Sequence, residues 1–110
     1  MRRTWIICAL CSDKGISALF QARYGKGGEL VQLFKEAQKE WTDVSPYGNL
    51  LLTDLSGPFF TVVTETEVAS LAEWERLIAE VFSLPEFGAW FARMMPLVEA
   101  GRREFYNIET

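Results

Sequence analysis

Residues 17–41 read SALFQARYGKGGELVQLFKEAQKEW, and the spacing of their apolar side chains changes halfway along. From Ser17 to Tyr24 the apolar side chains come at every second position, which is typical of a half-buried β-strand. The glycines from Gly25 to Gly28 predict a turn. Beyond the turn, apolar residues recur on one face of a helix: Leu30, Leu33, Phe34, Ala37 and Trp41. This stretch therefore predicts one strand, a tight turn and one amphipathic helix.

The rest of the chain continues with strands and helices in a recognisable order. The predicted elements are strands at 49–55 and 59–68, helices at 70–82 and 83–95, and a closing strand at 102–108. Gly57-Pro58 joins the two middle strands as a hairpin, and Ser70-Leu-Ala-Glu73 is a capping box that begins a helix. The order βαββαβ predicts an α+β, ferredoxin-like domain, a four-stranded antiparallel sheet with its helices on one face.

The length of 110 residues fits one domain, which we place at 17–110. Residues 1–16 form an N-terminal extension that we expect to be an extra strand, since its apolar stretch is short for a signal peptide and Leu10 does not suit a cleavage site. No apolar run reaches the roughly 20 residues of a membrane span, and we expect a cytoplasmic protein. With 15 acidic residues against 11 basic ones, nucleic acid is not expected as a partner.

The sequence contains no histidine, which removes the commonest general base, zinc ligand and haem ligand. A Ser-His-Asp or Cys-His arrangement is therefore excluded within one chain. Cys8 and Cys11 form a C-x-x-C pair that supplies only half of a zinc site, and we interpret them as small buried hydrophobes, with redox activity as the minor alternative. We expect no metal and no cofactor.

Apolar side chains occupy both faces of the predicted sheet. Phe59 and Val63 alternate with Phe60 and Val62, and the leucines at 50–52 are consecutive. A sheet with helices on one face normally turns polar side chains to the other, and an apolar outer face marks an interface. We therefore expect a homodimer in which two copies pack sheet to sheet.

From about Ser17 to Glu109 the chain resembles the dimeric α/β-barrel superfamily, which includes stress-responsive barrel domains and antibiotic-biosynthesis-type monooxygenases. The resemblance is carried by GKGGELVQLFKEA at 25–37, GPFFTVVTETEVASLAEWERL at 57–77 and GRREFYNIE at 101–109. It implies a homodimeric barrel with a cavity between sheet and helices in each subunit. Some members are oxygenases that need no metal or flavin. Others bind haem through a histidine that has no counterpart here.

The segment 86–95 is the strongest candidate for a ligand pocket, because it places aromatic residues and methionines at helical spacing. An elongated apolar guest, fatty-acid-like or polycyclic, would suit such a lining. The predicted apolar contacts are Trp74, Phe82, Phe87, Trp90, Phe91, Met94 and Met95, and the predicted polar anchors are Arg23, Tyr24 and Asn107. The alternative is that the apolar residues simply pack the core above the sheet and that the polar ones are solvated.

Three functions stay open at this stage. The first is binding of an apolar small molecule by a soluble homodimer. The second is a cofactor-independent oxygenase or isomerase acting on an aromatic or quinoid substrate, for which Trp74, Trp90 and Asn107 are available but no catalytic residue can be assigned. The third is a structural or interaction module with a filled core.

Overall fold

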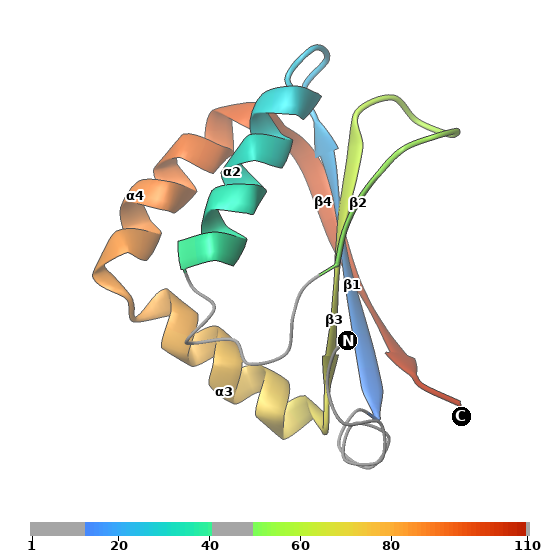
Figure 1. Ribbon diagram of the computed structural model, residues 1–110, viewed down its shortest axis with the longest axis vertical. Coiled ribbons are helices and arrows are strands. Elements are labelled where there is room, and N and C mark those ends of the chain that lie inside the picture. The colour runs from blue at the N-terminus through green and yellow to red at the C-terminus, as the bar shows by residue number, and fades with distance from the viewer. Residues whose placement is uncertain (1–12, 41–49, 110) are drawn as a thin grey trace.

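A computed structural model describes residues 13–40 and 50–109. Its elements are β1 (Lys14–Ala22), α2 (Gly27–Glu40), β2 (Leu50–Thr53), β3 (Thr61–Val68), α3 (Leu71–Phe82), α4 (Pro85–Met94), the 3-10 turn η1 (Met95–Leu97) and β4 (Val98–Asn107). The four strands form one sheet in the order β2-β3-β1-β4, and every neighbouring pair is antiparallel. The three α-helices of the described residues all lie on one face of this sheet, and none of them lies on the other face (Figure 1). The predicted ferredoxin-like α+β fold is confirmed.

The helices form where the sequence pattern predicts them. On α2 the apolar side chains of Leu30, Leu33 and Phe34 are buried, and Ala37 is half-buried, while Trp41 lies outside the described residues. Leu30 is completely enclosed, which contributes roughly 1.5–3 kcal/mol. Glu29 in its first turn and Lys39 in its last both suit the helix dipole. Ser70 caps α3 by accepting a hydrogen bond from the backbone N–H of Glu73, as the capping box predicts.

Two strands begin earlier than the sequence predicts. β1 starts at Lys14 rather than Ser17, and β4 starts at Val98 rather than Arg102. We expected Gly101 to precede the last strand, but it lies within β4 and pairs with Phe20. A Cβ on Gly101 would lie 3.3 Å from the backbone oxygen of Leu19, so the close approach of β1 favours glycine here.

The hairpin between β2 and β3 is confirmed, with Leu52 opposite Val63, but its turn is longer than predicted. β3 begins at Thr61, because Phe60 adopts a left-handed backbone conformation with φ of 62°. Phe59 and Phe60 therefore belong to the loop, and the prediction that they continue the alternating strand is wrong.

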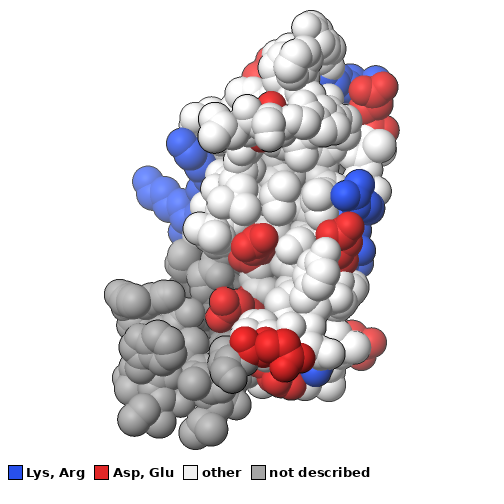
Figure 2. All heavy atoms as spheres, turned by 90° about the vertical axis from the view of Figure 1, so that its right-hand side faces the viewer, with Lys and Arg blue, Asp and Glu red and all other residues white. Residues whose placement is uncertain are grey.

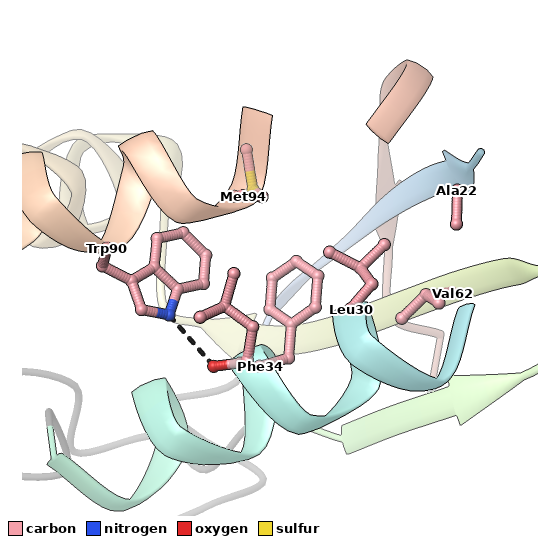
Figure 3. Packing of buried hydrophobic residues seen from close by; sticks show 7 residues of the cluster. Ala22, Leu30, Phe34, Val62, Trp90 and Met94 are labelled. Carbon is pink, nitrogen blue, oxygen red and sulfur yellow. Dashed lines mark hydrogen bonds between the residues drawn. The ribbon is translucent and has the colours of Figure 1, made fainter. Parts of the chain in front are cut away.

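The core between sheet and helices divides into two clusters. The larger one, shown in Figure 3, contains Ala22, Leu30, Leu33, Phe34, Val62, Trp90 and Met94. The smaller one contains Ile16, Val68 and Leu77, with Trp74 packed against it. A row of four residues crosses the inner face of the sheet between them, and none of the four is fully buried: Leu51, Thr64, Ala18 and Arg103.

The outer face of the sheet is less apolar than predicted. Its apolar centre is the row Leu52, Val63 and Leu19, which ends at Arg102 on β4. Charged side chains accompany this row: Figure 2 shows a band of uncharged residues with acidic side chains over its lower half and basic ones at its margins. Phe59 does not contribute, since it lies in the loop.

The predicted N-terminal strand, Cys8 and Cys11 fall mostly on residues 1–12 and so lie outside the described residues. None of the helices within 13–40 and 50–109 is both long and apolar enough to cross a membrane.

Candidate functional site

A cleft of about 320 Å³ lies where the N-terminus of α2 meets the adjoining ends of β2 and β3. Its lining consists of Gly27, Gly28, Val31, Thr53, Asp54, Phe59, Phe60, Thr61 and Val62. Val62 belongs to the larger core cluster and Val31 packs against it, whereas Asp54 and Phe59 are exposed. The cleft thus runs from the solvent to the edge of the core.

Phe60 and Gly27 shape this cleft together. The ring of Phe60 covers the start of α2 so closely that a Cβ on Gly27 would lie 2.9 Å from Phe60 Cδ1. The backbone of Phe60 is fixed from the other side, because its carbonyl accepts a hydrogen bond of 3.0 Å from the N–H of Ala22. A left-handed conformation costs a residue with a Cβ roughly 1–2 kcal/mol, and here tertiary contacts hold it in place.

Among the described residues, Asp54 is the only charged one that lines the cleft. One carboxylate oxygen, Oδ1, accepts a hydrogen bond of 3.0 Å from the backbone N–H of Thr61. The backbone N–H of Asp54 donates in return to the carbonyl of Thr61 at 3.1 Å. This reciprocal pair continues the β2–β3 ladder by one step and fixes the carboxylate at the rim of the cleft.

Aromatic rings border the cleft on its exposed side. Tyr24 packs edge to face against Phe60, with ring centroids 5.0 Å apart, and Phe59 lies 6.3 Å from Phe60. Tyr24 and Phe59 are 80% and 66% exposed. Of the residues predicted for the pocket, Tyr24 is the one that reaches this rim.

Trp90 and Met94, which the sequence analysis assigned to a pocket, are both buried in the larger core cluster. The indole Nε1 of Trp90 donates a hydrogen bond of 3.0 Å to the carbonyl of Leu33, and its ring lies 5.5 Å from that of Phe34 (Figure 3). This arrangement agrees with the alternative that these two residues pack the core.

The other aromatic residues of this region form a stack at the junction of α3 and α4. Phe87 lies 4.8 Å from Phe82 and 5.6 Å from Phe91, measured between ring centroids. Phe82 and Met95 are more than half exposed, and Phe91 is 40% exposed. These side chains therefore face outward more than the predicted pocket requires.

Trp74 lies apart from this stack, in the smaller core cluster. Its ring meets Phe105 edge to face at 6.2 Å, and the guanidinium of Arg103 lies 5.7 Å above it. The predicted polar anchors are also separated. Arg23, beyond the end of β1, donates to the carbonyl of Pro96, while Asn107 accepts from Lys14 at the start of β1.

The nine residues of β1 span about 25 Å, so Arg23 and Asn107 do not meet at one guest. The structure thus groups some of the predicted apolar residues, such as Phe82, Phe87 and Phe91. It places the predicted polar anchors Arg23 and Asn107 at opposite ends of the sheet.

The described groups whose pKa is shifted lie in exposed ion pairs and hydrogen bonds outside the cleft lining. The hydrogen bond from Arg93 lowers the pKa of Glu36. The phenol of Tyr106 lowers the pKa of Glu104 by donating to it, and the same bond raises the pKa of Tyr106. The lowered pKa values favour ionised carboxylates and the raised one favours a protonated phenol, so these shifts do not create a general base. Within 13–40 and 50–109, no group of three or more Cys, Asp or Glu residues could hold a metal ion.

The residues that form the cleft are not among those that the sequence predicts for a pocket. The sequence pattern places Gly27 in a turn and Phe60 in a strand, and it indicates no role for Asp54. The run of turn-forming residues at 54–58 was the available signal for a long loop.

Known structures share this architecture. A NIPSNAP family protein from Agrobacterium tumefaciens is 17% identical, with a TM-score of 0.77 over 84% of this chain and 90% of its own. A dimeric protein of unknown function and ferredoxin-like fold from Bacteroides fragilis is 16% identical, with a TM-score of 0.64 over 86% of this chain and 95% of its own. The chain has a ferredoxin-like fold.

A third structure with this fold is a putative antibiotic biosynthesis monooxygenase from Chloroflexus aurantiacus, 16% identical, with a TM-score of 0.67 over 90% of this chain and 95% of its own. No family model matches the sequence, and no curated protein does. At these identities the likeness shows the fold alone, which agrees with the resemblance read from the sequence and leaves function to the site.

Proposed function

We propose that this protein binds a small, mostly apolar molecule between sheet and helices, in the cleft at the start of α2. The observation that carries the proposal is the lining: apolar walls from Val31, Phe59, Phe60 and Val62 around a few polar groups. The volume of about 320 Å³ is at the lower end of the range for small-molecule sites, roughly 300–1,000 Å³. Tyr24 remains a proposed contact, because its ring extends the aromatic rim.

Native mass spectrometry of the purified protein, followed by organic extraction, tests for a guest. Binding of 1-naphthylmethanol, measured by its fluorescence, tests the cleft directly. Val31→Trp should fill the cleft and abolish both signals, whereas Gln32→Trp, on the exposed side of α2, should leave them unchanged. A wild-type protein that carries no guest and does not bind the naphthyl probe would contradict the proposal.

We also propose that two copies pair through the outer faces of their sheets. Leu52, Val63 and Leu19 form an apolar row there, and Leu50, on the same face of the edge strand, is 56% exposed. The Bacteroides fragilis protein of the same fold is described as dimeric.

Light scattering at micromolar concentration should give the dimer mass for the wild type and the monomer mass for Leu52→Glu. The matched control is Leu71→Glu, since this leucine is also exposed but lies on α3. A monomeric wild type, or a Leu52→Glu variant that stays dimeric, would contradict the sheet-to-sheet arrangement.

The hypothesis of an oxygenase or isomerase keeps its own test, which is oxygen uptake and product analysis with a panel of quinols. We place binding first because the cleft lining offers one carboxylate, two threonine hydroxyls and apolar surface, a set that orients a guest. If the wild type turned over a quinol and Val31→Trp abolished this turnover, the result would favour catalysis in the same cleft over binding alone. A chain that neither binds nor turns over such compounds would favour the structural module.

A further inference from the structure

We infer that the cleft selects an apolar amine, with its protonated nitrogen against Asp54 and its hydrocarbon body against Phe59, Phe60 and Val62. This inference rests on the proposed function and adds the chemical class of the guest. Its starting point is that the described residues of the lining include one charged side chain, and that this side chain is a carboxylate.

The carboxylate of Asp54 has acceptor capacity left for a guest. Its Oδ1 accepts from the N–H of Thr61 at 3.0 Å, and an ionised carboxylate offers about four acceptor positions on its two oxygens. Among the described residues no lysine or arginine forms an ion pair with Asp54. Within 13–40 and 50–109, no side chain therefore neutralises the negative charge at the rim.

The two cations that come just before α2 in the sequence have partners of their own. Lys26, just before α2, pairs with Glu29 at 3.3 Å. Arg23 donates its Nε–H to the carbonyl of Pro96 at 3.0 Å. Because Lys26 and Arg23 make these contacts outside the lining, neither contact indicates that the cleft binds an anion.

The N-terminus of α2 contributes charge of the opposite sign, because Gly27 and Gly28 also line the cleft. A helix N-terminus carries about +0.5 of an elementary charge, against a full negative charge on the carboxylate. The net charge at the rim is thus negative. A guest carboxylate would be repelled, while a protonated amine would form a charge-assisted hydrogen bond.

The aromatic wall favours the same class of guest. Phe59 and Phe60 line the same cleft as Asp54, and a cation over an aromatic face gains about 0.5–1 kcal/mol at exposed sites. The net charge of −4 on the whole chain also attracts cations from a distance. A fatty acid bound in the same orientation, by contrast, would place its carboxylate next to that of Asp54, and the two negative charges would repel each other.

Three probes with the same ring system test this inference: 1-naphthylmethylamine, 1-naphthylmethanol and 1-naphthoate, each titrated calorimetrically into the full-length protein. We expect the amine to bind at least tenfold more tightly than the carboxylate, with the alcohol in between. Asp54→Asn should lower the affinity for the amine about tenfold and leave that for the alcohol unchanged. The asparagine keeps the oxygen that accepts from Thr61, so the hairpin should persist.

Glu29→Gln is the matched control, because it removes one negative charge at the same end of α2 from a residue outside the lining. It should leave the preference for the amine intact. The inference would be overturned if the wild type bound the amine and the carboxylate with equal affinity, or bound the carboxylate more tightly. In that case, binding of the alcohol would still support the proposed function. If the wild type binds none of the three probes, both are overturned.

Discussion

The indole of Trp90 on α4 is hydrogen-bonded to the carbonyl of Leu33 on α2, with 3.0 Å between Nε1 and the oxygen. This bond joins two helices above the sheet, at a point where both residues are buried. Trp90 therefore acts as a tie between helices, and its side chain fills the larger core cluster.

Replacing this indole should weaken the fold. Trp90→Phe removes the hydrogen bond and part of the buried volume, and we expect a loss of about 1–3 kcal/mol in the free energy of unfolding. Urea unfolding followed by circular dichroism measures it. Phe91→Leu, at a 40% exposed position on the same helix, should change the stability by much less. Equal losses for the two variants would contradict the assignment of Trp90 to the core.

The contact between Gly27 and Phe60 should make the first two residues of α2 respond differently to alanine. Gly27→Ala would place its Cβ 2.9 Å from the Phe60 ring, so we expect a destabilisation of about 1–3 kcal/mol from overpacking. Gly28→Ala meets no heavy atom within 4 Å and should stabilise the helix by up to about 1 kcal/mol. Thermal unfolding of the two variants side by side checks the prediction, and the same sign for both would contradict it.

The ion pair between Glu36 on α2 and Arg93 on α4 should make stability depend on pH. Both guanidinium nitrogens Nη1 and Nη2 donate to the carboxylate, at 2.9 and 3.2 Å. The pKa of Glu36 is lowered in the folded state, first by this hydrogen bond. Its contribution is therefore present above the ordinary glutamate pKa of about 4.3 and is lost as the pH falls through the lowered folded value.

Urea midpoints measured from about pH 6 down to about pH 3 should fall less steeply for Glu36→Gln than for the wild type. Glu75→Gln replaces an exposed carboxylate on α3 for which the described residues supply no ion pair. This control should follow the wild-type profile. A Glu36→Gln profile parallel to the wild type would show that the pair contributes nothing.

The cap of α3 offers a further test. Ser70 Oγ accepts from the N–H of Glu73 at 3.2 Å, and loss of such a cap costs about 1 kcal/mol. Ser70→Ala should lower the free energy of unfolding by that amount, whereas Ser56→Ala, in the exposed β2–β3 loop, should not. Chemical denaturation of both variants gives the comparison.

Most of the fold could be predicted from the sequence, because spacing of apolar residues follows directly from burial on one face. The periods of residues 17–41 predict the unit formed by β1 and α2, and the capping box at Ser70 predicts the start of α3. Gly101 was misleading, since a glycine within a strand and one before a strand look alike in sequence. Only the pairing of Gly101 with Phe20 in the sheet shows that this glycine lies within the strand.

The candidate site could not be predicted in the same way. Packed core and pocket lining use the same apolar residues, so the composition of 86–95 could not separate Trp90 from Phe91. The cleft depends on Phe60 adopting a left-handed conformation, which runs against the preference of a residue with a Cβ. Its cause is a tertiary contact with Ala22 and Gly27, and such contacts leave no local pattern in the sequence.

The central claim is that a guest binds in the cleft at the start of α2. The most direct measurement is an NMR titration of the 15N-labelled protein with 1-naphthylmethylamine. We predict that the backbone amide signals of Gly28, Asp54 and Thr61 shift, while the indole N–H signal of Trp90, held by Leu33, stays in place. Shifts centred on the Trp90 indole, with the cleft amides unmoved, would contradict the account.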